Sequence, residues 1–218
     1  MKTLIMLFKV LLIITQARSQ DISLIAKNLE GIDVKIEEVT YKSKTAIRLT
    51  ESPEAAENLA IVKGIQFTDG TITAELAGSP LPSANNTARG FIGVAFRVKK
   101  GDTIRYDCFY LRPTNGRADD QIRRNHSTQY IAHPEYPWFR LRKEFPSMYE
   151  SYVDIVEEEW TKIKIEVKGK QAKLYVNDAE QPSLIVNSLL NAESTGGIAL
   201  WVGQGTDGYF RNLKVTKN

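Results

Sequence analysis

Both histidines of the chain lie in one unusual stretch, residues 106–154, together with other side chains able to do chemistry. His126 and His133 are candidate acid–base residues, because an unperturbed imidazole has a pKa near ~6.5. Asp120, which precedes both histidines, is a candidate to orient one of them, and Tyr149 is a candidate proton donor for a lyase. The spacing does not enforce catalysis, so hydrogen-bonding or structural roles stay open for both histidines.

The same stretch is rich in arginine and aromatic residues, which suit the binding of a sugar. Aromatic rings pack against the C–H faces of a sugar, and arginine and tyrosine hydrogen-bond its hydroxyl groups. The candidates here are Arg123, Arg124, His126, Tyr136, Trp138 and Arg140. The alternative is that the arginines only fix a long loop by pairing with carboxylates. Those carboxylates are Asp107, Asp119, Asp120 and Glu135.

Carboxylates at the end of this stretch do not have the spacing of a glycosidase. In an extended strand, Glu150 and Asp154 lie about 13 Å apart at ~3.3 Å per residue. Retaining glycosidases need about 5 Å between their carboxyl groups, and inverting ones up to about 9.5 Å. The sequence therefore favours binding over hydrolysis by a carboxylate pair.

Two predicted strands place further candidates on one face of a sheet. In residues 91–98 every second side chain from Ile92 onward is apolar, and the opposite face carries Gly93, Ala95 and Arg97. Small residues on that face leave room for a ligand. The next predicted strand, residues 104–112, pairs with the first as a hairpin, and Trp201 points outward from a strand at 197–202. We expect one platform for a sugar, formed by Arg97, Tyr110, Arg112 and Trp201.

Short alternating segments continue along the rest of the chain, with a turn about every ten residues. The predicted strands are residues 34–39, 46–50, 59–62, 64–67, 71–76, 149–155, 160–167, 172–177 and 209–215, with a short strand within 182–191. One helical turn is expected near Pro53. The pattern predicts an all-β fold, a two-sheet antiparallel sandwich.

The last strands carry a recognisable resemblance. The segments EWTKIKIEVKG, AKLYVND, GGIALWVG and YFRNLKV resemble the closing half of the concanavalin A-like lectin/glucanase jelly roll. Within that superfamily the chain is most similar to the secreted bacterial laminin-G-like group that includes 3-keto-disaccharide hydrolase domains. The resemblance covers most of residues 67–215 and implies saccharide binding on a sheet face or at its rim. The superfamily contains lectins, glycanases and lyases, so the resemblance specifies the fold better than the function.

The first 19 residues have the pattern of a signal peptide. Lys2 precedes an apolar run from Leu4 to Ile14, and Ala17 and Ser19 fit the cleavage rule. The run is too short to span ~30 Å of hydrocarbon, so no membrane insertion is expected after cleavage. We expect a secreted or periplasmic bacterial protein, with residues 20–218 as a single β-sandwich domain.

Removal of the signal peptide leaves 29 − 3 = 26 basic and 26 acidic residues, a balance that does not favour nucleic acid as a partner. Cys108 is the only cysteine and is expected to be buried. The sequence has no zinc-ligand motif and predicts no cofactor. A structural calcium ion at Asn177 and Asp178, or at Asp207, is left open.

The leading hypothesis is a secreted jelly-roll domain that binds a saccharide on a sheet face and on an arginine-rich, aromatic loop. Two alternatives stay open. The first is a glycoside hydrolase or lyase of the 3-keto-disaccharide type, and the second is a cell-surface protein-interaction module.

Overall fold

The computed structural model describes residues 18–51, 57–192 and 195–217 of the chain. The predicted signal peptide lies outside these residues except for Arg18 and Ser19, and the helical turn predicted near Pro53 also lies largely outside them. In the described part, no helix is long and apolar enough to span a membrane.

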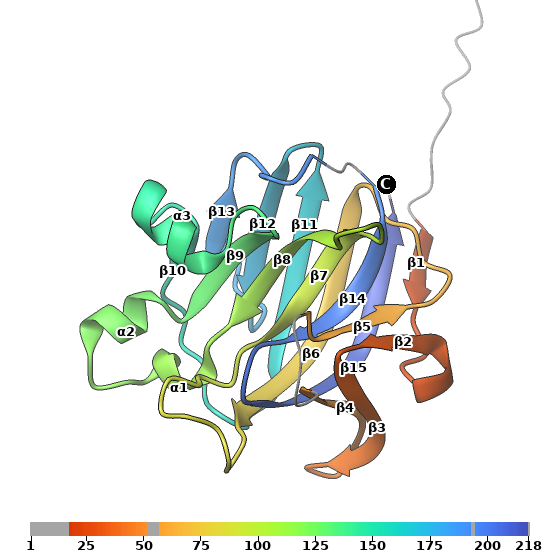
Figure 1. Ribbon diagram of the computed structural model, residues 1–218, viewed down its shortest axis with the longest axis horizontal. Coiled ribbons are helices and arrows are strands. Elements are labelled where there is room, and N and C mark those ends of the chain that lie inside the picture. The colour runs from red at the N-terminus through yellow and green to blue at the C-terminus, as the bar shows by residue number, and fades with distance from the viewer. Residues whose placement is uncertain (1–17, 52–56, 193–194, 218) are drawn as a thin grey trace, which may run out of the picture.

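Two antiparallel sheets pack face to face, as the alternating pattern predicts (Figure 1). Sheet A has the strand order β13-β12-β11-β6-β15-β4-β3, with β1 paired to β15. Its strands are β1 (Arg18–Asp21), β3 (Val34–Tyr41), β4 (Lys44–Glu51), β6 (Gly70–Pro80), β11 (Thr161–Lys168), β12 (Gln171–Val176), β13 (Leu184–Val186) and β15 (Thr206–Lys217).

Sheet B has the strand order β10-β9-β8-β7-β14-β5-β2. Its strands are β2 (Leu29–Ile32), β5 (Leu59–Val62), β7 (Ile92–Lys99), β8 (Arg105–Leu111), β9 (Thr128–His133), β10 (Glu150–Ser151) and β14 (Gly197–Val202). A 3-10 helix, η1 (Ala26–Asn28), precedes β2. Three short helices, α1 (Pro113–Gly116), α2 (Gln121–Asn125) and α3 (Trp138–Glu144), lie beside β8 and β9 (Figure 1).

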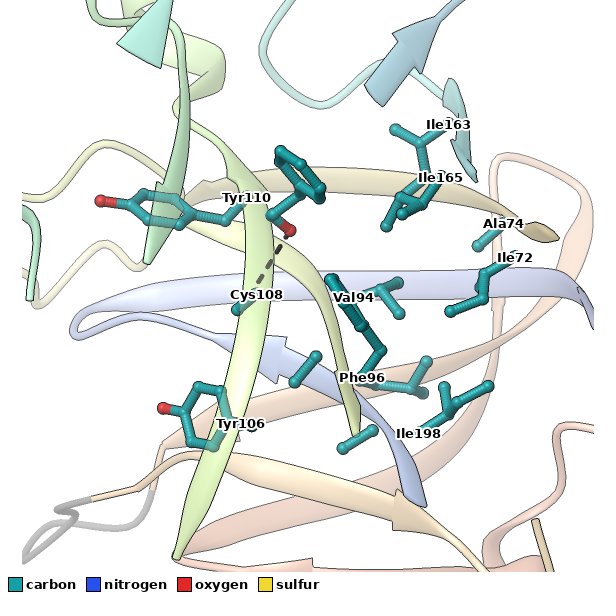
Figure 2. Close-up of a cluster of buried hydrophobic side chains, with 14 of the residues drawn as sticks. Ile72, Ala74, Val94, Phe96, Tyr106, Cys108, Tyr110, Ile163, Ile165 and Ile198 are labelled. Atoms are coloured by element: carbon teal, nitrogen blue, oxygen red, sulfur yellow. Dashed lines mark hydrogen bonds between the residues drawn. The ribbon is translucent and has the colours of Figure 1, made fainter. Parts of the chain in front are cut away.

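The hydrophobic core fills the space between the two sheets. Figure 2 shows Val94, Phe96 and Ile198 of sheet B facing Ile72 and Ile163 of sheet A, and all five are buried. Burying each such side chain stabilises the fold by about 1.5–3 kcal/mol. Because side chains alternate along β7 and β8, the residues between these core residues have their side chains on the outer face of sheet B, as predicted.

The thiol of Cys108 is fully buried, as expected, and burial raises its pKa well above the usual range. It lies between Tyr106 and Tyr110, whose rings extend away from the sandwich interior (Figure 2). On the inner face of the same strand, Asp107 is completely buried and accepts a hydrogen bond from the Tyr130 hydroxyl at 2.5 Å. Burial raises the pKa of Asp107 to about 6.

The 106–154 stretch has more regular structure than the sequence indicated. Residues 128–133 form β9, a strand that was not predicted, and its pairing with β8 places His133 opposite Tyr106. The strand predicted at 149–155 is only the two-residue β10. The strand predicted at 64–67 is wrong, because Phe67 makes only a single bridge, to Gly196.

Arg97 does not lie on the predicted platform. The pairing of β7 with β8 shifts register between Phe96 and Lys99, and Arg97 has a φ of 54°. This bulge turns the side chain away from the outer face, where alternation would have placed it. Its guanidinium is buried and donates to the carbonyls of Thr68 and Gly169 and to Asp69. The prediction that Arg97 shares a face with Tyr110 and Arg112 is therefore wrong.

Candidate functional site

A cavity of about 720 Å³ lies over the outer face of sheet B. Its volume is in the range of pockets that bind small molecules. Side chains from the outer face of the sheet form the floor. The walls are formed by helices α1, α2 and α3, by the 81–91 loop, and by the segments before β5 and after β14.

The cavity floor is aromatic because a glycine separates two large rings. Gly93 in β7 is paired with Tyr110 of β8 on one side and with Trp201 of β14 on the other. The ring centroids of Tyr110 and Trp201 therefore come within 4.9 Å of each other. Phe91 contacts Tyr110 edge-on, and Tyr106 extends the floor along β8. The predicted space beside Gly93 is thus filled by its neighbours' rings.

One end of the cavity, the arginine end, is lined by Arg89, Arg112, Arg123 and Arg142. Arg112 is buried and donates hydrogen bonds to the Tyr110 hydroxyl at 2.7 Å, to Gln129 and to the His126 carbonyl. Its guanidinium also lies 5.1 Å from the Tyr110 ring centroid. These contacts hold Arg112 at the edge of the aromatic floor.

His126 also lines the arginine end, beside Glu150. Its Nδ1 lies 2.8 Å from Glu150 Oε2, although the angle is not that of a hydrogen bond. Glu150 is held in place by Arg142, which donates to the same oxygen at 2.8 Å. Burial lowers the pKa of His126. Glu150 raises it, while Arg142 and Arg112 lower it further. The imidazole is therefore neutral at pH 7 and can accept a proton.

The opposite end, the acidic end, is lined by Glu57, Asn58 and His133. His133 stacks on Tyr106 with 4.8 Å between ring centroids, and its Nε2 lies 3.2 Å from Glu57 Oε2. Asn58 is buried, and its Oδ1 has no hydrogen-bond partner among the described residues. Arg112 follows Tyr106 along one strand, so the two ends lie about 20 Å apart at ~3.3 Å per residue.

The structure places part of the predicted site in the cavity. The predicted residues that line it are Tyr110, Arg112, Arg123, His126, His133, Trp138 and Trp201. Those that do not line it are Arg97, Asp120, Arg124, Tyr136, Arg140 and Tyr149.

Asp120 orients neither histidine, because its carboxylate caps helix α2 by accepting from the amides of Ile122 and Arg123. Tyr149 is buried against Tyr130 and Phe145. Both proposed catalytic roles are therefore contradicted by position.

Three predicted binding residues face away from the cavity because of partners elsewhere. Arg124 donates to the Tyr152 hydroxyl at 2.8 Å. Arg140 bonds Glu144 and lies over the ring of Tyr136. The expectation that arginines fix the loop by pairing with the carboxylates named from the sequence is wrong for Arg140, which pairs with Glu144 of its own helix and donates to the backbone carbonyl of Glu135.

Several residues that line the cavity were not predicted from the sequence. Arg142 was recoverable, because Trp138 and Arg142 are four residues apart and share one face of α3. Arg89, Asn115, Glu57 and Asn58 come from loops and short segments with no such periodicity. Glu150 was considered only as a glycosidase carboxylate, and its contact with His126 has no signature in the sequence.

The two aspartates considered for calcium take part in ion pairs, and the Asn177 side-chain oxygen accepts a hydrogen bond from the Lys162 amide. Asp207 accepts from Arg48 Nε at 2.7 Å, and Asp178 accepts from Lys162 at 2.6 Å. Among the described residues, no group of three histidine, cysteine or acidic side chains is arranged to hold a metal ion.

Comparison with known proteins gives a family match and similar folds. Residues 26–216 match the model of a family described as the 3-keto-alpha-glucoside-1,2-lyase-like domain. No protein of curated function matches the sequence.

Among solved structures, the carbohydrate-binding module CBM66 from Bacillus subtilis is similar at 12% identity and a TM-score of 0.54, covering 86% of this chain and 95% of that one. Peanut lectin is similar at 10% identity and a TM-score of 0.54, covering 93% of this chain and 97% of the lectin. The predicted concanavalin A-like sandwich is confirmed.

Proposed function

The chain belongs to the 3-keto-alpha-glucoside-1,2-lyase-like domain family, and we propose from this premise that its cavity binds a saccharide. The observation that carries the proposal is the aromatic floor, where the half-buried ring of Trp201 lies beside the buried rings of Tyr106 and Tyr110, with Trp138 in the wall and Arg112 at the edge. Such a floor suits the C–H face of a sugar ring, and guanidinium donors suit its hydroxyl groups. The carbohydrate-binding module and the lectin with similar folds support the proposal.

The length of the cavity favours a ligand with more than one ring or with a substituted ring. Donors gather at the arginine end, and acceptors gather at the acidic end, where Asn58 Oδ1 is buried without a hydrogen-bond partner among the described residues. A buried acceptor without a partner costs free energy, which a sugar hydroxyl bound there would recover. The predicted signal peptide at residues 1–19 extends the proposal to a secreted or periplasmic protein.

Trp138 provides a test of the binding site. The residue is 45% exposed, and its ring centroid lies 5.0 Å from the Arg142 guanidinium and 5.9 Å from that of Arg112. We expect Trp138→Ala to weaken saccharide binding about tenfold, as for other aromatic residues that anchor a ligand, and to leave the fold intact. Isothermal titration calorimetry measures the change.

Tyr152→Ala is the matched control for this test. Tyr152 is 40% exposed and lies outside the cavity, so its loss removes an aromatic ring without touching the proposed site. Equal affinities of Trp138→Ala and Tyr152→Ala for the saccharide would contradict the placement of the site.

Catalysis of an elimination reaction is the second candidate function, and the His126–Glu150 pair favours it. The family description names a 1,2-lyase and a 3-keto-alpha-glucoside. In such a glucoside the hydrogen on C2 is acidic because it is next to the C3 carbonyl. A base removes this proton, the C2–H electron pair forms a C1=C2 double bond, and the C1–O bond breaks. The leaving oxygen takes a proton and departs as an alcohol.

His126 is suited to the role of base because it lines the cavity and because burial, which lowers its pKa, keeps the imidazole unprotonated at pH 7. Glu150 stabilises the imidazolium that forms, since its carboxylate lies 2.8 Å from Nδ1. Arg112 lies at the same end and can stabilise negative charge that develops on the C3 oxygen. This mechanism uses one imidazole, so it does not require the carboxylate pair that the sequence lacks.

A further inference from the structure

The arginine end holds guanidinium groups that lack carboxylate partners. Arg89 donates to the carbonyls of Asn86 and Ala88, and Arg123 donates to the Thr114 carbonyl and to Asn115. Arg112 donates to the His126 carbonyl and to the neutral side chains of Tyr110 and Gln129. Within the described part of the chain, none of these three arginines forms an ion pair with a carboxylate.

Burial makes this excess of positive charge costly. Only 5% of Arg112 is exposed. Burial also lowers the pKa of Arg89, and the positive charges of the nearby Arg123 and Arg112 lower it further. A group of like charges around one cavity is unfavourable unless a counter-charge arrives.

The acidic groups near the cavity do not supply that counter-charge. Glu150 is bound by Arg142 through both guanidinium Nε and Nη2 and also contacts His126. Glu57 lines the cavity at the acidic end, beside His133, about 20 Å from the arginine end. A neutral sugar would leave Arg89, Arg112 and Arg123 without a negative partner.

We propose that the arginine end receives an anionic substituent of the saccharide, a carboxylate, sulfate or phosphate group, so that the ligand is an acidic sugar. This inference rests on the proposed saccharide binding and narrows its substrate class. Arginine suits the task because its planar guanidinium forms paired, charge-assisted hydrogen bonds with carboxylate, sulfate and phosphate oxygens. The aromatic floor then holds the ring to which the anionic group is attached.

The test is a set of calorimetric titrations with matched probes. The neutral probe is methyl α-glucoside, and the acidic probes are methyl α-glucuronide, glucose 6-sulfate and glucose 6-phosphate. Inorganic sulfate and inorganic phosphate are the sugar-free anions. We expect at least one acidic sugar to bind about tenfold to a hundredfold more tightly than methyl α-glucoside and than the inorganic anions, as charge-assisted hydrogen bonds predict. The three acidic probes identify which anion is preferred.

Two neighbouring arginines of α2 provide a matched pair of variants. Arg123 lines the cavity, whereas Arg124 lies outside it and bonds Tyr152. Arg123→Gln is expected to weaken binding of the acidic sugar about tenfold. Arg124→Gln removes the same charge outside the cavity and is expected to leave the affinity for the acidic sugar unchanged. Higher salt should weaken binding of the acidic sugar and not that of methyl α-glucoside, because salt screens the charge interaction.

The outcomes separate this inference from the proposed function. Binding of methyl α-glucoside as tightly as every acidic sugar would overturn the inference and leave saccharide binding intact. Inorganic anions that bind as tightly as the acidic sugars would also overturn it, because the site would then recognise a free anion. Equal effects of Arg123→Gln and Arg124→Gln would overturn the assignment to this cavity. Failure of all the sugars to bind would contradict the proposed function itself.

Discussion

His126→Ala is expected to lower kcat for elimination from a 3-keto-α-glucoside by about 10²–10⁴-fold, the usual contribution of a general base. The imidazole lines the arginine end of the cavity and is neutral at pH 7 because burial lowers its pKa. Removing it leaves the aromatic floor in place, so saccharide binding should persist. Steady-state kinetics that follow the released alcohol measure the loss.

The pH dependence of kcat/KM and a control variant at the second histidine test the same prediction. The base must be unprotonated, so kcat/KM should be flat above the lowered pKa of His126 and should fall as the pH drops through it, below about 6.5. Added imidazole should partly restore turnover to His126→Ala. His133→Ala is expected to raise KM with little change in kcat, because His133 lies at the acidic end, about 20 Å away.

An unchanged kcat in His126→Ala would exclude the elimination candidate with this base and leave the binding proposal standing. Complete loss of saccharide binding in the same variant would instead show that the imidazole holds the ligand.

Gly93→Ala is expected to disrupt both the fold and the binding site. A Cβ atom at this position would lie 2.2 Å from the Phe109 carbonyl oxygen and 2.6 Å from the Tyr110 Cβ, so the backbone of β8 must shift. Overpacking of this kind costs about 1–3 kcal/mol of the free energy of unfolding. Because the Tyr110 and Trp201 rings meet across Gly93, the shift should also weaken saccharide binding by more than about tenfold.

Gly101→Ala is the control for Gly93→Ala. A Cβ at Gly101 meets only the Thr103 carbonyl oxygen, at an ordinary 3.7 Å, so its effect on the free energy of unfolding should stay within about 0.5 kcal/mol. Chemical denaturation and calorimetric titration of both variants measure the two effects. Retention of full stability and affinity by Gly93→Ala would contradict the packing described for the floor.

The strands of the two sheets were predictable because they alternate apolar and polar residues in a simple way. β14 (Gly197–Val202) has the predicted bounds, and Trp201 points outward as expected. The alternation of β8 correctly placed Tyr110 on the outer face, opposite Phe109. Alternation failed at Arg97, because a bulge reverses the direction of a side chain without changing the type of residue in the strand.

The site was harder to predict because short helices were read as a loop. In an extended or irregular segment, Arg140 and Arg142 are equivalent candidates. In helix α3 only Arg142 lies on the face of Trp138, and Arg140 turns toward Glu144. The contact between His126 and Glu150 depends on the pairing of β9 with β10, which brings together residues that the sequence does not relate.

The most direct measurement of saccharide binding in the cavity uses the three tryptophan indole N–H signals in an NMR titration with the saccharide. Trp138 and Trp201 line the cavity, whereas Trp160 packs against Tyr41 and has the Arg211 guanidinium of sheet A over its ring. Saccharide in the cavity should shift the Trp138 and Trp201 signals and leave Trp160 unchanged. Absence of any shift at saturating saccharide, or a shift of Trp160 alone, would contradict the placement of the site.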